Sequence, residues 1–269
     1  MARTDTLTNF LTDVSTAIKT KKGDDTPILA SNFDTEITNL PSGGVEPPTK
    51  GFTVDELDSD GYATKVTVYG SSIPNGAFGC SSSSYKPYLS YNLTDVSFNE
   101  PVTKIGKYAF RDASNLVNIG SLDNVTSLGE SAFMGCSKLK VKSANKVTMF
   151  YTTSFSGCSS LIQMSMESTT GILGGNTTNG AFYKCTSLKA VWIGSSITDS
   201  GFSRYSFNGC TSMIKMFIDL PRATVETFTN YQYTFMNNAN KTGIIVCNDD
   251  EGFITREEFD AIDWAAYTE

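Results

Sequence analysis

Cysteine carries the most reactive side chain in this sequence, and four of the six cysteines recur at one spacing. Cys136, Cys158, Cys185 and Cys210 each stand three residues after a Phe. A thiolate can act as a nucleophile or a metal ligand, and six cysteines could form a disulfide framework. Cys–His nucleophile pairs and His-based metal clusters need histidine, however, and the sequence contains none. We therefore interpret the four as a column of small buried side chains and expect no catalytic, cofactor or metal site.

Two other stretches have weak similarity to ion or phosphate sites. Asp58, Asp60 and Gly61 resemble the start of a calcium loop, but Thr67 stands where the closing Glu should be. Asp60-Gly61 is instead typical of the turn of a β-hairpin. The glycine-rich stretch 171–176 lacks the Lys and the spacing of a phosphate loop, so we expect an irregular loop there.

An aromatic pair is the remaining candidate for a ligand contact. Side chains alternate across a strand, so if Leu188, Val191 and Ile193 face a core, Trp192 faces outward. Phe217 holds the same place one repeat later, and neighbouring strands lie about 4.8 Å apart. The pair is typical of a carbohydrate or protein contact surface.

Small polar residues surround this pair in the expected strand register. The predicted ligand-contact set is Trp192, Phe217, Gln163, Ser165 and Lys215. The alternative is that a loop, the C-terminal helix or a second copy of the chain covers the two rings.

The strands that would hold these residues belong to the units of one repeated sequence motif. A small residue followed by Phe recurs at 109–110, 132–133, 154–155, 181–182 and 206–207, and successive Phe residues from Phe78 to Phe235 lie 22 to 32 residues apart. A period of this length predicts stacked units that bury their apolar faces against each other. Six residues after each Phe stands an apolar residue: Leu116, Leu139, Leu161, Leu188 and Met213. Five residues before it stand Ile105, Leu128, Phe150, Thr177 and Phe202, of which Thr177 breaks the pattern.

Residues 104–110 and 127–133 carry the phrase I-G-x-x-A-F and closely resemble the leucine-rich repeats of the BspA-like type. The resemblance covers about residues 70–247. It implies an α/β repeat fold, a leucine-rich-repeat solenoid with short parallel strands. It also implies binding rather than catalysis, since solenoids are used mainly as extended contact surfaces.

The flanking segments of the body, residues 52–269, predict caps. Residues 52–57 and 62–69 alternate as two strands, which predicts a capping hairpin over 52–72. Thr255 and Glu258 have the spacing of a capping box, which predicts a helix over 255–267 that closes the end of the repeats.

Residues 1–40 predict a helical anchor, followed by a linker at 41–51 that is rich in Pro and Gly. The apolar stripe of its first helix is Leu7, Phe10, Leu11, Val14 and Ile18, which we expect to serve assembly. Residues 7–40 resemble the N-terminal module of structural proteins from phages and prophages of Gram-positive bacteria. That resemblance implies attachment to other virion proteins and a homo-oligomer, with a trimer as one possibility.

Composition excludes several kinds of partner. The net charge of −7 disfavours nucleic acid and anionic membranes, and we find no basic patch in the sequence that would offset it. No apolar run is long enough to cross a bilayer, and no secretory signal precedes the first helix.

These observations predict a non-enzymatic phage virion protein, of the tail, baseplate or head-fibre type. It would be made in the host cytoplasm, held by its N-terminus, and bound to a glycan or protein of the bacterial surface through the repeats. One alternative is a bacterial cell-surface adhesin or interaction protein, and another is a cell-wall glycan hydrolase with paired carboxylates.

Overall fold

The computed structural model describes residues 51–60, 62–79, 92–174, 179–229 and 244–268. The chain divides into two compact units, Met1–Pro48 and Thr49–Glu269, and all described residues belong to the second. The predicted anchor, with Leu7, Phe10, Leu11, Val14 and Ile18, and the linker up to residue 50 lie outside the described residues.

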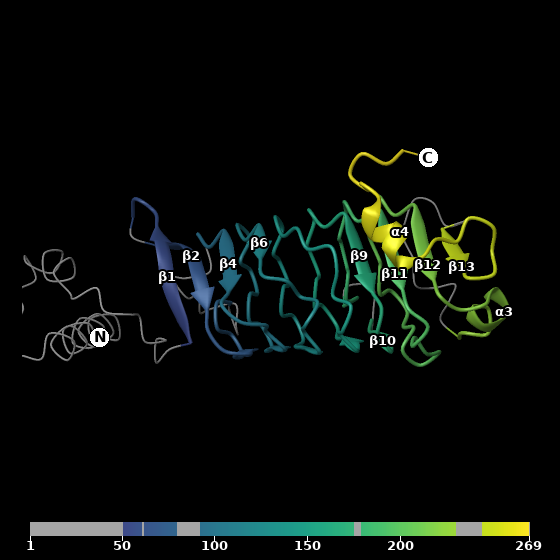
Figure 1. The fold of residues 1–269 in the computed structure, drawn as a ribbon, viewed down its shortest axis with the longest axis horizontal. Coiled ribbons are helices and arrows are strands. Elements are labelled where there is room, and N and C mark those ends of the chain that lie inside the picture. Colours follow the sequence, from purple (N-terminus) through teal and green to yellow (C-terminus); the bar gives the residue numbers. More distant parts are fainter. Residues whose placement is uncertain (1–50, 61, 80–91, 175–178, 230–243, 269) are drawn as a thin grey trace, which may run out of the picture. The chain divides into compact units, whose positions relative to one another are not determined.

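The second unit begins with the predicted hairpin (Figure 1). Strand β1 (Phe52–Leu57) pairs antiparallel with β2 (Ala63–Val68), and β1 is the edge strand of its sheet. The Asp58 carboxylate accepts hydrogen bonds from the backbone N–H groups of Asp60 at 3.0 Å and Tyr62 at 2.9 Å. This side chain therefore fixes the turn, as expected from the turn interpretation.

From β2 onward each repeat contributes one short rung to a parallel face, which we call the sheet face. Its rungs pair in parallel register within two sheets: β2, β4 (Asp95–Phe98) and β6 (Asn118–Ile119), then β9 (Gln163–Met166), β11 (Ala190–Ile193), β12 (Lys215–Ile218) and β13 (Ile245–Cys247). Between the two sheets, residues 140–144 form an irregular rung. Lys140 N–H donates to Val117 O, and Ser165 N–H donates to Lys142 O, both at 3.0 Å. The predicted solenoid with short parallel strands is confirmed.

A second row of two-residue strands runs beside the sheet face. It consists of β3 (Ser72–Ile73), β5 (Lys104–Ile105), β7 (Ser127–Leu128), β8 (Met149–Phe150) and β10 (Gly171–Ile172). Ile172 lies between Phe150 and Phe202 in this row, in the place that the sequence pattern assigned to Thr177. The extra residues of this repeat therefore follow the strand instead of preceding it, and the prediction of an irregular loop is wrong for Gly171–Ile172.

The recurring Phe residues stack in the core. Ring centroids of successive members are 5.0 to 5.4 Å apart along the series Phe78, Phe110, Phe133, Phe155, Phe182 and Phe207, and each ring is at most 1% exposed. Phe235 lies outside the described residues. One repeat cannot enclose such a ring, so the column forms only because neighbouring repeats stack.

The cysteine column runs beside the Phe column. Cys136, Cys158, Cys185 and Cys210 are buried and free. Each thiol donates a hydrogen bond of 3.0 to 3.1 Å to the carbonyl of the Phe one repeat earlier. The prediction of a column of small buried side chains is confirmed.

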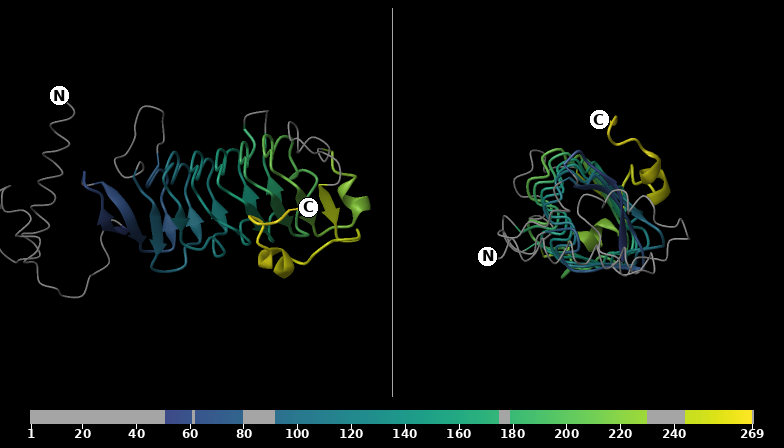
Figure 2. Two further views of the ribbon diagram at one scale, coloured as in Figure 1. Left: turned by 90° about the horizontal axis from the view of Figure 1, so that it is seen from above. Right: turned by 90° about the vertical axis from the view of Figure 1, so that its left-hand side faces the viewer.

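Among the described residues, two short helices follow β12: α3 (Arg222–Val225) and α4 (Arg256–Ala261). Helix α4 has the expected capping box between Thr255 and Glu258. It does not close the end of the repeats, however. It lies on the outer side of the sheet face, over β9, β11 and β12 (Figures 1 and 2).

Candidate functional site

Trp192 and Phe217 are neighbours on the sheet face, as the repeat register predicted. Trp192 pairs with Phe217 on one side and Ser165 on the other, and both rings point outward from the strands. They are only 5% and 4% exposed, however, so the prediction of an exposed aromatic pair is wrong.

The C-terminal segment covers these rings, which is one of the alternatives left open by the sequence. Residues 253–267, which we call the C-terminal cover, pack Phe259 and Trp264 against Phe217 with ring centroids 6.0 and 6.1 Å apart. The Trp192 indole N–H donates to Ile254 O at 3.2 Å. The sequence shows that this segment carries apolar residues, but it does not indicate the surface against which they pack.

Polar contacts fasten the end of the cover to the sheet face. The Lys189 ammonium donates to Ala265 O at 3.0 Å and to Tyr267 O at 3.1 Å. At the other end, the Arg256 guanidinium lies 3.4 Å from the Glu167 carboxylate and 2.9 Å from that of Asp260. The cover is therefore held at both ends as well as through its apolar centre.

The other predicted ligand contacts lie on or beside the covered region. Gln163 and Ser165, on β9, are buried, whereas Lys215 on β12 is half-buried. The Gln163 amide nitrogen and the Ser165 hydroxyl have no hydrogen-bond partner among the described residues. Burying such a group without a partner costs about 1–3 kcal/mol, which is a local cost of the fold at these two positions.

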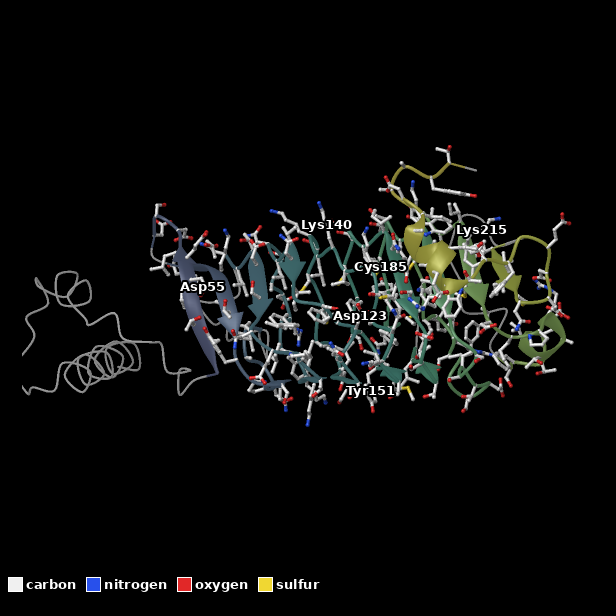
Figure 3. All side chains as sticks on the ribbon, viewed as in Figure 1. Asp55, Asp123, Lys140, Tyr151, Cys185 and Lys215 are labelled. Atoms are coloured by element: carbon white, nitrogen blue, oxygen red, sulfur yellow. The ribbon has the colours of Figure 1, made fainter. Side chains whose placement is uncertain are left out.

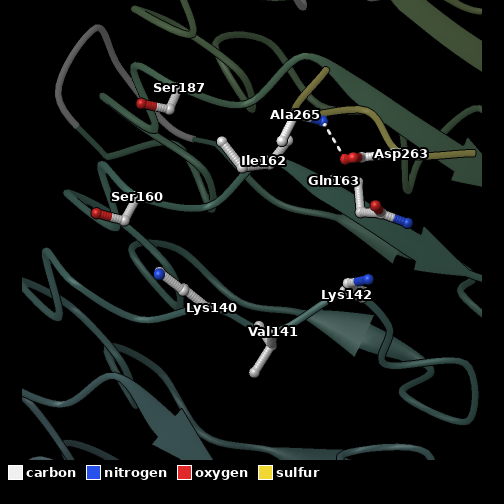
Figure 4. Close-up of a pocket in the computed structure, with 9 residues that line it drawn as sticks. All are labelled: Lys140, Val141, Lys142, Ser160, Ile162, Gln163, Ser187, Asp263 and Ala265. Atoms are coloured by element: carbon white, nitrogen blue, oxygen red, sulfur yellow. Dashed lines mark hydrogen bonds between the residues drawn. The ribbon is translucent and has the colours of Figure 1, made fainter. Parts of the chain in front are cut away.

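A pocket opens beside the cover, at the irregular rung of the sheet face (Figure 4). Its volume is about 430 Å³, which lies within the range of small-molecule sites. Its lining residues come from three repeats and the cover: Lys140, Val141, Lys142, Ser160, Ile162, Gln163, Ser187, Asp263 and Ala265. We call it the lysine pocket.

The polar groups of the lysine pocket differ in whether they donate or accept hydrogen bonds. Lys140 and Lys142 are exposed and supply two cationic donors. Backbone N–H groups of Ala265 at 3.1 Å and Ala266 at 3.4 Å hold the Asp263 carboxylate in place. Figure 4 shows Gln163 between Asp263 and Lys142 in the view. The pocket can thus donate to and accept from a polyhydroxy ligand, with cationic donors in excess.

Among the predicted contacts, only Gln163 lines this pocket. Lys140 and Lys142 were missed, although the sequence carries a signal for them. Lys138, Lys140 and Lys142 alternate at the period of a strand; Lys140 and Lys142 lie on the rung at 140–144, and Lys138 lies in the turn before it. This local concentration of lysine differs from the expectation that no basic patch interrupts the acidic chain. Figure 3 shows Lys140 and Tyr151 at opposite margins of the repeats.

None of the helices in the described residues is long and apolar enough to cross a membrane. Nor do the described residues bring together three or more side chains that could hold a metal ion.

Comparison with known proteins identifies the repeats. A family model described as BspA type Leucine rich repeat region, with six copies, matches residues 81–214 and 176–250. Curated protein sequences give no significant match.

Two solved structures are similar. One is a leucine-rich repeat protein of T. pallidum, with 19% identity and a TM-score of 0.49 over 73% of this chain and 100% of that chain. The other is a leucine-rich repeat protein of Bacteroides ovatus ATCC 8483, with 20% identity and a TM-score of 0.31 over 58% of this chain and 31% of that chain. The sequence match spans more than half of the chain and agrees with the parallel rungs and the Phe column, and the chain therefore belongs to the BspA-type leucine-rich repeat family.

Proposed function

We propose that this chain is a non-enzymatic binding protein that attaches to a polymer of the bacterial surface through the sheet face. The lysine pocket is the observation that carries the proposal. It opens on the part of the sheet face beside the cover, and serine, glutamine and lysine side chains line it. Such groups bind hydroxyl-rich ligands through hydrogen bonds, and this binding involves no chemical reaction of the ligand.

The composition of the pocket also supports binding over glycan hydrolysis. Hydrolases of this kind normally act through two carboxylates that flank the scissile bond. Asp263 is the one carboxylate among the described residues that line the pocket. Its Oδ1 atom already accepts two backbone hydrogen bonds, an arrangement that favours a fixed acceptor.

The attachment proposal can be tested with the full-length chain. Fluorescently labelled protein is mixed with cell walls isolated from a panel of Gram-positive bacteria, after protease treatment to remove wall proteins. We expect saturable retention on at least one wall type, without release of reducing sugar. Absence of retention on every wall type would reject attachment to a wall polymer, and release of sugar would favour a hydrolase.

More specifically, we propose that the chain is part of a phage particle. This proposal rests on the resemblance of residues 7–40 to phage structural modules, with the apolar stripe from Leu7 to Ile18 as the contact for assembly into an oligomer, such as a trimer. A cell-surface adhesin remains the alternative because the family and the wall-binding proposal fit both. Electron microscopy of particles carrying the gold-labelled protein separates them, since label confined to bacterial cells would favour the adhesin.

A further inference from the structure

We infer that the lysine pocket recognises a sugar or polyol unit that carries one negative charge. This inference rests on the proposed attachment function and names the chemistry of its ligand. The shared feature is an anionic group with hydroxyls beside it, as in a uronic acid or a glycerol phosphodiester. The charge of the lining and its apolar part favour such a ligand.

The charge of the lining favours a monoanion. Lys140 and Lys142 contribute two positive charges and Asp263 contributes one negative charge, which leaves an excess of one positive charge. This excess is notable in a chain whose net charge is −7, because the rest of the surface repels anions. A ligand with one negative charge would neutralise the pocket, and Asp263 would accept from a neighbouring hydroxyl.

Gln163 is the buried polar residue of the pocket lining. It is 4% exposed, lines the pocket, and has an amide nitrogen without a hydrogen-bond partner among the described residues. That nitrogen has almost no solvent-accessible surface, so an oxygen of a ligand would satisfy this donor only after the Gln163 side chain turned toward the pocket. Because no described residue accepts from this nitrogen, such a turn would break none of its hydrogen bonds within the described part of the chain.

The apolar part of the lining and the size of the pocket favour a ring or a polyol over a simple ion. Ile162 and Ala265 supply apolar atoms beside the polar groups, whereas the Val141 side chain packs in the hydrophobic core. The face of a sugar ring carries C–H groups that such atoms can contact, and the aliphatic stems of the lysines add to this surface. A volume of about 430 Å³ far exceeds the space that one ion requires, given about 30 Å³ for each liquid water.

The test measures binding of the full chain to three probes by isothermal titration calorimetry at low salt. The probes are oligogalacturonate, poly(glycerol phosphate) and the neutral oligosaccharide maltohexaose. We expect one or both anionic probes to bind, and the one that binds identifies carboxylate or phosphodiester as the anionic group. Binding should weaken as the salt concentration rises, and maltohexaose should bind more weakly than the anionic probe. Equal binding of maltohexaose, or no binding of either anionic probe, would overturn the inference.

Matched variants locate the binding. Lys140→Gln and Lys142→Gln should each weaken binding of the anionic probe about tenfold, as expected for loss of one charge-assisted hydrogen bond. Lys138→Gln is the control, because Lys138 lies in the turn just before this rung, outside the pocket lining, and donates to Asn115 at 2.7 Å. Equal weakening by all three would show diffuse attraction and overturn the inference.

Two further measurements separate the possible causes of failure. Lys140 and Lys142 are exposed, so melting temperatures of the variants should match that of the unaltered protein. If the double variant Lys140→Gln/Lys142→Gln still attaches to cell walls as the unaltered protein does, the lysine pocket is not the site and the attachment function stands. If the unaltered protein does not attach to any wall, the attachment function itself fails.

Discussion

The side chains at the cysteine position are adapted to a repeating interior. Each thiol fills a small space beside the Phe column and donates to a Phe carbonyl of the preceding repeat. Burial raises the pKa of the Cys136, Cys158 and Cys210 thiols above the ordinary value. The thiolate is the reactive form, so this environment makes these cysteines inert.

The raised pKa of Cys136 predicts a loss of stability at alkaline pH. Above the unfolded-state pKa of about 9, the unfolded thiol releases its proton while the folded thiol keeps it. The free energy of unfolding should then fall by about 1.4 kcal/mol per pH unit for this one residue. Urea unfolding between pH 8 and 10 should show a shallower decline for Cys136→Ala than for the unaltered protein. Ser137→Ala should keep the original slope, and identical slopes for all three proteins would contradict the prediction.

At the scale of elements, the C-terminal cover determines which part of the sheet face is available. It shields the outward aromatic residues of β11 and β12, whereas the rung at 140–142 remains beside its edge. Asp263 and Ala265 of the cover also line the lysine pocket. The same segment therefore removes one candidate site from solvent and completes another.

Phe259 should be the residue on which docking of the cover most depends. Its ring is fully buried, 6.0 Å from Phe217 and 5.2 Å from Trp264 between ring centroids. Phe259→Ala should destabilise the cover by about 3–5 kcal/mol. The two tryptophans of the chain, Trp192 and Trp264, both lie in this cluster, so their fluorescence reports on the cover directly.

The expected result for Phe259→Ala is a red-shifted emission with stronger quenching by acrylamide. Glu257→Ala is the control, because Glu257 is an exposed residue of the same helix. Unchanged emission from Phe259→Ala would show that the cover is held by its other contacts.

At the scale of the whole repeat unit, each rung contacts mainly its two neighbours. Backbone hydrogen bonds pass from one repeat to the next, as from Phe110 N–H to Ala132 O and from Phe133 N–H to Ser154 O, both at 2.8 Å. Stability in such an array is approximately a sum over repeats and their interfaces. The central rungs have neighbours on both sides, whereas β1 is an edge strand.

This arrangement predicts a gradient of hydrogen exchange along the repeats. Amides of the central rungs, from Phe110 to Phe182, should exchange most slowly, and those of β1 should exchange faster because opening an end breaks one interface only. Hydrogen exchange followed by mass spectrometry at peptide resolution measures the gradient. Uniform protection from β1 to the central rungs would indicate a single cooperative unit.

The sequence by itself determined the solenoid, the Phe and cysteine columns and the terminal capping box. Equal spacing places equivalent side chains in register on successive rungs, so Phe110, Phe133 and Phe155 could be assigned to one column without any tertiary information. The outward direction of Trp192 followed from alternation along its strand in the same way.

The tertiary structure alone decided what covers that strand and where a pocket remains. The Trp192 bond to Ile254 spans 62 residues, and the Lys189 bond to Ala265 spans 76. The strand and helix periods describe neighbours within one element, and the repeat period describes equivalent positions on successive rungs. None of them specifies where a segment outside the repeats will pack. The burial of Trp192 and Phe217, and the meeting of Lys140 and Lys142 with Asp263, depend on that packing and could be seen only in the folded chain.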